Sequence, residues 1–167
     1  NQPTGQFYRI NVDNQFPYRI YAAQQDNSSV VIASRELGSG GVTENSWTAS
    51  AGGESAFLAF DPDNPRYVMG GSYAGTIDLL DTKARAGTNI MAAPIQYQSM
   101  DAKDMRYRYT WNAPIIWSSP TTFYHGAQVL LKTTDLGKTW KEISPDLTRN
   151  EKAKQGPAGV PYTNEGV

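Results

Sequence analysis

The stretch of sequence that decides the fold is Thr133-Thr134-Asp135-Leu136-Gly137-Lys138-Thr139-Trp140. Its residue types describe a tight turn between two strands, because the Asp135 carboxylate can accept backbone N–H groups within the turn and Gly137 tolerates a positive φ. Trp140 is expected to open the next strand and to pack beneath the hairpin. We therefore expect structural roles for five residues of this stretch: Thr133, Asp135, Gly137, Thr139 and Trp140.

An internal repeat extends this hairpin to the rest of the chain. Three segments, beginning near Phe7, Ser55 and Ala113, share runs of β-branched and aromatic residues separated by clusters of Gly, Pro, Asn and Asp, which are strand and turn signals. The turn prolines Pro17, Pro65 and Pro120 are 48 and 55 residues apart, which is close to the length of one four-stranded propeller blade. No segment requires a helix.

The repeat predicts an all-β fold of about three four-stranded antiparallel blades of a β-propeller, in residues 1–145. The expected blades cover about 1–46, 47–110 and 111–145, with a long insertion at 84–109. Residues 146–167 are polar and contain Gly and Pro, and we expect a linker or surface arm there. Because propellers close with about four to eight blades, we expect these blades to belong to a larger ring, and the chain to be a fragment or to be completed by other polypeptide. Apolar faces are expected at both ends of the three-blade segment.

The composition excludes several classes of function. Fifteen Lys and Arg against sixteen Asp and Glu give a net charge of −1, so no basic surface is expected to bind nucleic acid. The absence of Cys and the single His125 argue against zinc sites of the Cys or poly-His type, and we expect neither a metal nor a cofactor. No apolar run approaches the length of a membrane helix, so no membrane insertion is expected.

The stretch at residues 133–140 matches the Asp-box pattern Ser/Thr-x-Asp-x-Gly-x-Thr-Trp at every defined position. Together with residues 5–8, 22–29, 52–55 and 143–150, it resembles BNR-repeat β-propellers of the sialidase, sortilin and xyloglucanase kind. These are large secreted bacterial proteins, often labelled glycosyl hydrolases by homology. The resemblance implies that the box is structural, joins the third and fourth strands of a blade and faces away from any catalytic centre. It also implies an extracellular, cell-surface or periplasmic location.

The chain departs from a sialidase at the expected signature Arg-Ile-Pro. Arg9-Ile10-Asn11 and Arg19-Ile20-Tyr21 both lack the proline, and Arg alternating with aromatic residues is typical of a solvated strand face. The Pro-rich stretch Asp61-Pro62-Asp63-Asn64-Pro65 lacks the ligand spacing of a calcium loop and is interpreted as a turn.

Two carboxylates are the candidate catalytic residues of a glycosidase, which needs a pair flanking the scissile bond. Asp26 lies in the loop Gln24-Gln25-Asp26-Asn27, and Glu54 follows Gly52-Gly53; both lie next to strand ends. The alternative gives Asp26 and Asn27 a turn role and makes Glu54 the partner of an Arg or a backbone amide.

A second group of residues is a candidate ligand surface. Tyr107, Tyr109 and Trp111 alternate with Arg106 and Arg108, which predicts a strand with its aromatic residues on one face and its arginines on the other. Such a row could stack on sugar rings or could face a core. Gln25 and Asn27 join the aromatic residues as candidate carbohydrate contacts.

Two hypotheses about function remain open at this point. In the first, the chain is a propeller segment that acts as a structural and interaction scaffold, with the remaining blades or an associated polypeptide as its partner. In the second, it is part of a polysaccharide-acting hydrolase or carbohydrate-binding propeller that uses Asp26 or Glu54. Whether the full protein is an enzyme stays undecided, and no glycosidase turnover is expected from this chain alone.

Overall fold

The computed structural model describes residues 4–38, 40–93 and 100–156. This part of the chain is all-β and forms three four-stranded antiparallel sheets, each a meander in chain order, as the sequence predicts. The first sheet contains β1 (Phe7–Val12), β2 (Arg19–Gln24), β3 (Ser29–Ala33) and β4 (Trp47–Ala49). The second contains β5 (Leu58–Phe60), β6 (Tyr67–Gly71), β7 (Ile77–Asp81) and β8 (Ala86–Asn89). The third contains β9 (Ile115–Ser119), β10 (Thr122–Gly126), β11 (Leu130–Thr133) and β12 (Lys141–Glu142).

Short 3₁₀ turns complete the secondary structure of the described residues. They are η1 (Glu44–Ser46), η2 (Tyr73–Gly75), η3 (Ala102–Asp104) and η4 (Lys152–Lys154). Two expected boundaries need correction. Trp47–Ala49 belongs to the first sheet rather than to the second blade, and Ala86–Asn89 is the fourth strand of the second sheet rather than part of an insertion.

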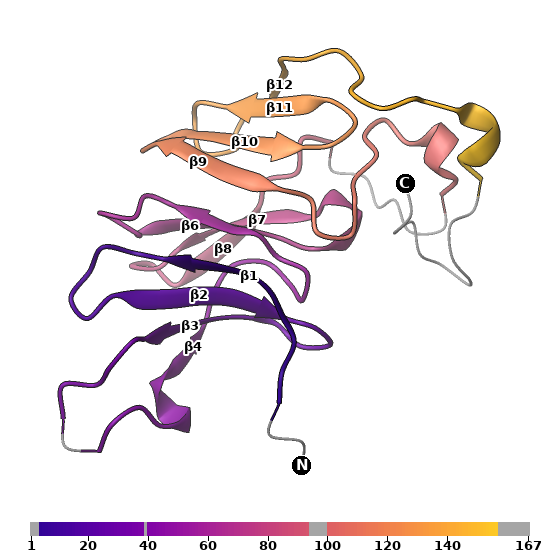
Figure 1. Cartoon of the computed structure of the whole chain (residues 1–167). Coiled ribbons are helices and arrows are strands. Elements are labelled where there is room, and N and C mark those ends of the chain that lie inside the picture. The colour runs from indigo at the N-terminus through magenta and orange to yellow at the C-terminus, as the bar shows by residue number, and fades with distance from the viewer. Residues whose placement is uncertain (1–3, 39, 94–99, 157–167) are drawn as a thin grey trace.

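The three sheets pack side by side like consecutive blades of a propeller, and the ring is not closed (Figure 1). The first strands of the sheets lie closest together, because β5 contacts both β1 and β9. The connection into the second sheet also approaches β6 very closely. A side chain at Gly70 would collide with the backbone carbonyl of Ala51, so glycine is required there.

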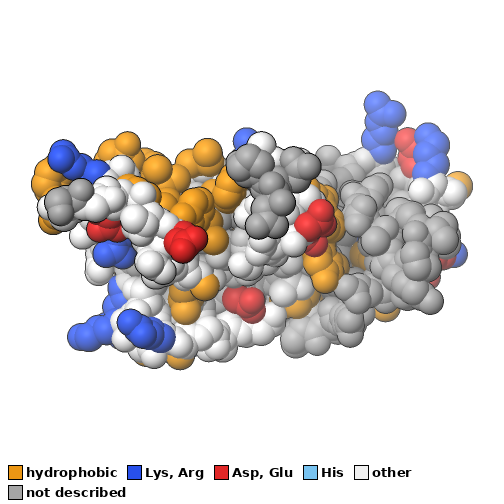
Figure 2. Space-filling model, turned by 90° about the horizontal axis from the view of Figure 1, so that it is seen from below, with side chains coloured by type: hydrophobic (Ala, Val, Ile, Leu, Met, Phe, Trp, Pro, Cys, Tyr) orange, Lys and Arg blue, Asp and Glu red, His pale blue; other side chains and the backbone are white. Residues whose placement is uncertain are grey.

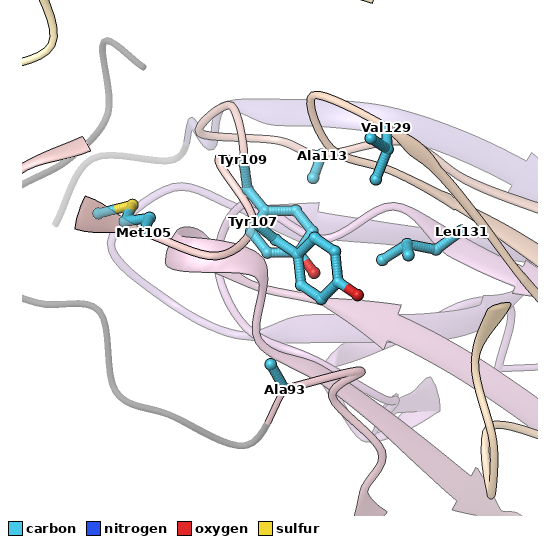
Figure 3. Close-up of a cluster of buried hydrophobic side chains, with 7 residues drawn as sticks. All are labelled: Ala93, Met105, Tyr107, Tyr109, Ala113, Val129 and Leu131. Carbon is cyan, nitrogen blue, oxygen red and sulfur yellow. The ribbon is translucent and has the colours of Figure 1, made fainter. Parts of the chain in front are cut away.

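Two apolar clusters hold the sheets together. Between the first and second sheets, Tyr21 of β2 packs with Leu58 and Phe60 of β5 and with Val68 of β6, and all four side chains are buried. Between the second and third sheets, a second cluster contains Ala59, Met69, Ile77, Ile90, Ile115 and Phe123. Leu58 and Phe60 of β5 face the first sheet and Ala59 between them faces the third, so the second sheet is covered on both faces. A third cluster lies under the loops that precede β9, around Tyr107 and Tyr109 (Figure 3).

The face of the first sheet opposite Tyr21 is apolar, and at its β1 edge Ile10 and Val12 border a pocket with Phe57 and Ile116. Strand register aligns two complete rows across this face: Ile10, Ala22, Val30, Ala49 and Val12, Ile20, Ile32, Trp47. Ile10 is 64% exposed, Val12 50% and Trp47 44%. Figure 2, seen from the end of the molecule where the first sheet lies, shows hydrophobic side chains gathered in a patch on this surface. We call these two rows the free face.

The outer face of the third sheet mixes polar and apolar side chains, unlike the free face, because Leu130 lies on the same face of β11 as Lys132. Its row across the four strands is Ile116, Tyr124, Lys132 and Lys141. Lys132 lies over the Tyr124 ring at 5.6 Å, so a cation covers the aromatic side chain. Ile116, which is 60% exposed, is the only aliphatic residue of this row.

Candidate functional site

One end of the three-sheet assembly collects most of the predicted site residues. In an antiparallel meander every second connection lies at the same end. The β2–β3 and β6–β7 turns therefore share an end with the connections from β4 to β5 and from β8 to β9. Gln25 and Asp26, Glu54 and Trp111 lie on these connections, whereas the turn at residues 134–140, between β11 and β12, lies at the opposite end.

Glu54 joins the two carboxylate-bearing loops. Its Oε2 accepts the backbone N–H of Asp26 at 2.7 Å and the side-chain amide of Gln25 at 3.0 Å. The same Gln25 nitrogen donates to Asp26 Oδ1 at 2.9 Å. Asp26 adopts the left-handed region with a φ of 57°, which is typical of Asp in tight turns. The structure thus brings Gln25, Asp26 and Glu54 into one network that links the first sheet to the second.

Aromatic side chains extend this network. The Tyr8 hydroxyl donates to Gln25 Oε1 and accepts the indole N–H of Trp111 at 2.9 Å. Trp111 stacks on Tyr73, with ring centroids 5.5 Å apart and planes 4° from parallel, and Tyr73 is 38% exposed. We call Tyr8, Gln25, Asp26, Glu54, Tyr73 and Trp111 the end cluster. Its amide and carboxylate edges beside aromatic planes can hydrogen-bond hydroxyl groups and stack on a ring.

Three members of the predicted ligand surface do not take part in the end cluster. The Asn27 side chain is exposed, and only its backbone N–H is bonded, to the Gln24 carbonyl at 3.1 Å. Tyr107 and Tyr109 are 4% and 3% exposed and meet edge-on at 6.3 Å inside the third cluster (Figure 3). Sequence reasoning missed Tyr8 and Tyr73 as site residues. The available signal was the position of each aromatic residue, with Tyr8 at the start of a predicted strand and Tyr73 in a predicted turn.

The expected alternation at residues 106–111 is wrong, because this segment is not a strand. Arg108 is 7% exposed and faces inward. Its guanidinium donates to Asp146 at 3.1 Å, to the Thr148 hydroxyl at 2.6 Å and to Asn150 at 3.2 Å. Residues 146–150 therefore form a surface arm that is docked on the fold by the buried Arg108 guanidinium. The alternation in the sequence instead predicts Arg108 on the strand face opposite the aromatic residues.

The turn at residues 133–140 has the geometry that the sequence predicts. Asp135 accepts the Thr139 backbone N–H at 2.9 Å, the Thr139 hydroxyl at 2.6 Å and the Thr133 hydroxyl at 2.8 Å. These hydrogen bonds, those of Thr139 first, lower the pKa of Asp135 to about 2. Gly137 has a φ of 82°, and Leu136 also lies in the left-handed region at 60°. The Trp140 indole donates at 2.7 Å to the carbonyl of Ile90, which directly follows β8, and this bond ties the turn to the end of the second sheet.

His125 of β10 is buried in the core of the third sheet. It is 1% exposed, stacks on Tyr109 at 4.8 Å and lies 6.0 Å from Trp140. Neither ring nitrogen has a hydrogen-bond partner. Burial lowers the pKa of His125 to about 4, so the imidazole is neutral in the folded protein near pH 7.

Within residues 4–38, 40–93 and 100–156, no group of three or more Asp, Glu or His side chains is arranged to hold a metal ion. The described part of the chain also contains no helix of the length and apolarity needed to span a membrane. Comparison with known proteins gives no matching family model, no matching curated protein and no matching solved structure.

Proposed function

We propose that this chain is a segment of an extracellular BNR-repeat β-propeller, and that it acts as a structural and interaction scaffold completed by other polypeptide. The observation that carries the proposal is the free face of the first sheet. Large exposed apolar patches on soluble proteins mark interaction surfaces, and two complete rows of this sheet are apolar from β1 to β4.

The position of the free face supports a sheet as its partner. The second sheet packs Leu58 and Phe60 against the sheet that precedes it in the chain, and the third sheet packs Ile115 and Phe123 in the same way. The free face is the equivalent surface of the first sheet, since Tyr21 on its other side already contacts the second sheet. In all three sheets, apolar side chains occupy this face, which the second and third sheets direct toward the sheet that precedes them in the chain. A further blade is the occupant that fits this pattern.

The scaffold proposal is tested by placing a charge on the free face. Ile32→Lys should reduce self-association of the chain, because a Lys in the middle of an apolar row must be desolvated on contact. Leu147→Lys, at an exposed side chain of the docked surface arm, is the matched control and should leave association unchanged. The measurement is light scattering after size-exclusion chromatography, with far-ultraviolet circular dichroism to verify folding. Equal association of both variants and the unmodified chain would contradict the proposal.

The end cluster favours a second candidate function, binding or hydrolysis of a polysaccharide. The stacked Tyr73 and Trp111 offer an aromatic plane next to the amide of Gln25 and the carboxylates of Asp26 and Glu54. Glycosidases use paired carboxylates in two distinct roles. Here Glu54 is occupied by a backbone amide of the neighbouring loop, as the structural alternative for this residue expects.

This second function is separable from the first by experiment. Glycan-array binding is measured on the unmodified chain and on Trp111→Ala, together with release of reducing sugar from the glycans that bind. Binding that is lost in the variant would establish a carbohydrate site at the end cluster. Turnover by the unmodified chain would overturn the preference for a scaffold.

A further inference from the structure

A groove runs between the outer strands of the first and second sheets, and of its lining residues Ala49 alone belongs to the free face. Its volume is about 580 Å³, and its walls include Tyr21, Val31 and Thr48 of the first sheet and Leu80 of the second. Tyr21, Val31 and Thr48 are register neighbours across β2, β3 and β4, so they form one continuous wall. Both walls belong to the described chain, and the groove therefore does not depend on what covers the free face.

Two arginines give this groove a positive charge. Arg19, at the start of β2, and Arg85, in the turn before β8, both line it and are both exposed. Neither forms an ion pair with any carboxylate of the described residues, although six such pairs exist elsewhere in this part of the chain. The Arg19 side chain also hydrogen-bonds the Tyr21 hydroxyl, which is a neutral group, so both guanidinium groups keep N–H donors for an incoming anion.

The carboxylates nearest to these arginines in the sequence are already engaged. Asp81, next to Leu80, pairs with Arg66 at 2.8 Å and also accepts two backbone N–H groups of the β7–β8 turn. Asp13 is 2% exposed and accepts the Tyr21 hydroxyl at 3.0 Å together with the Arg19 backbone N–H at 2.7 Å. Asp81 is thus neutralised by Arg66, whereas Asp13 is buried and does not line the groove, so Arg19 and Arg85 are the charged side chains of its walls.

The inner surface of the groove is apolar and lacks an open aromatic plane. Val31 and Leu80 are half-buried and pack on the core between the sheets, while the Tyr21 ring is 2% exposed. Sugars bind proteins largely through exposed aromatic planes, which are found here at the end cluster instead. The surface formed by Val31 and Leu80 can instead contact aliphatic side chains of a ligand.

We propose that this groove binds an extended acidic peptide segment, with aliphatic side chains against Val31 and Leu80 and carboxylates on Arg19 and Arg85. The edge strand β4 borders the groove through Thr48 and Ala49, and its outer backbone groups can pair with an extended chain. The partner is thus recognised by the combination of negative charge and aliphatic side chains.

The test uses fluorescence anisotropy with a fluorescein-labelled octapeptide of alternating Leu and Asp, and with the same peptide carrying Asn in place of Asp. The Asp peptide should bind the full chain, with an affinity that falls as salt is raised. Arg19→Gln and Arg85→Gln should each weaken binding by about fivefold, the size expected for one exposed charge pair. Thr48→Trp should block binding by filling the groove while both charges stay in place.

Arg35→Gln is the matched control, because Arg35 is exposed, lies outside the groove and carries the same charge. It should leave the affinity unchanged. Equal binding of the Asp and Asn peptides, or an equal loss in Arg35→Gln, would overturn the proposal. A heparin-derived hexasaccharide is the third probe. If it binds through Arg19 and Arg85 while the Asp peptide does not, the groove is an anionic-glycan site and the peptide proposal is wrong.

Discussion

Asp135 holds Thr139 with both of its carboxylate oxygens, one accepting the backbone N–H at 2.9 Å and the other the side-chain hydroxyl at 2.6 Å. Through Trp140, the next residue, the same turn is fixed to the Ile90 carbonyl at the end of the second sheet. A hairpin turn of the third sheet is therefore also part of the contact between two sheets.

The first prediction concerns acid stability at this turn. Because the pKa of Asp135 is lowered from 3.8 to about 2, its stabilisation is present above pH 4 and is lost as the pH falls through about 2. Asp135→Asn should lower Tm at pH 7, and the difference from the unmodified chain should shrink toward pH 2. The measurement is thermal unfolding across this pH range. Glu36→Gln, at an exposed side chain, should show no difference at either pH.

His125 predicts a second pH dependence with a different window. A buried imidazole with a pKa of about 4 binds its proton less readily than the unfolded chain, whose His titrates near 6.5. Stability should therefore be full above pH 6.5 and should fall as the pH drops toward 4. His125→Leu should remove this dependence, and it should raise the stability by about 1 kcal/mol because two unpaired nitrogens are no longer buried. Denaturant unfolding at pH 7.5 and 5.0 measures both effects; an unchanged slope with pH in the variant would contradict the assignment.

Two isoleucines allow the contribution of inter-sheet packing to stability to be compared with that of an exposed side chain. Ile77 is fully buried between the second and third sheets, whereas Ile116 is 60% exposed on the outer face of the third. Ile77→Ala should lower the free energy of unfolding by about 2 to 5 kcal/mol. Ile116→Ala should change it by less than about 0.5 kcal/mol. Similar losses in the two variants, measured by denaturant unfolding, would mean that the sheets do not pack as blades.

The last substitution tests the role of Glu54. If its main role is to bind the Asp26 backbone N–H, Glu54→Gln should destabilise the chain by about 1 to 2 kcal/mol, since a charged acceptor is replaced by a neutral one. The amide resonance of Asp26 should shift in the ¹H–¹⁵N spectrum, while Glu36→Gln should leave it in place. If Glu54→Gln is as stable as the unmodified chain and the Asp26 amide resonance does not shift, the structural role assigned to the Glu54 carboxylate is wrong.

The sequence predicts the repeat and the turn at residues 133–140 because both depend on local signals. Alternating apolar residues, turn prolines and the Thr133, Asp135, Gly137 set all act within a few residues. The joining of Asp26 to Glu54 also follows from the meander, which returns alternate loops to one end.

Other features depend on contacts that are distant in sequence. Arg108 is buried because Asp146, Thr148 and Asn150 fold back onto it from about 40 positions away. Trp111 finds Tyr8 across 103 positions. The mixed outer face of the third sheet depends on which residues strand register aligns with Ile116, and alternation alone does not reveal that Lys132 covers Tyr124.

The central claim is that the free face of the first sheet is an interface that other polypeptide completes. Sedimentation equilibrium of the unmodified 167-residue chain over a wide range of concentration tests it most directly. We predict a weight-average mass that rises above 18.4 kDa with concentration, because exposed apolar rows and unpaired sheet edges favour association. A constant mass of 18.4 kDa from a chain that is folded and unfolds cooperatively would contradict the claim.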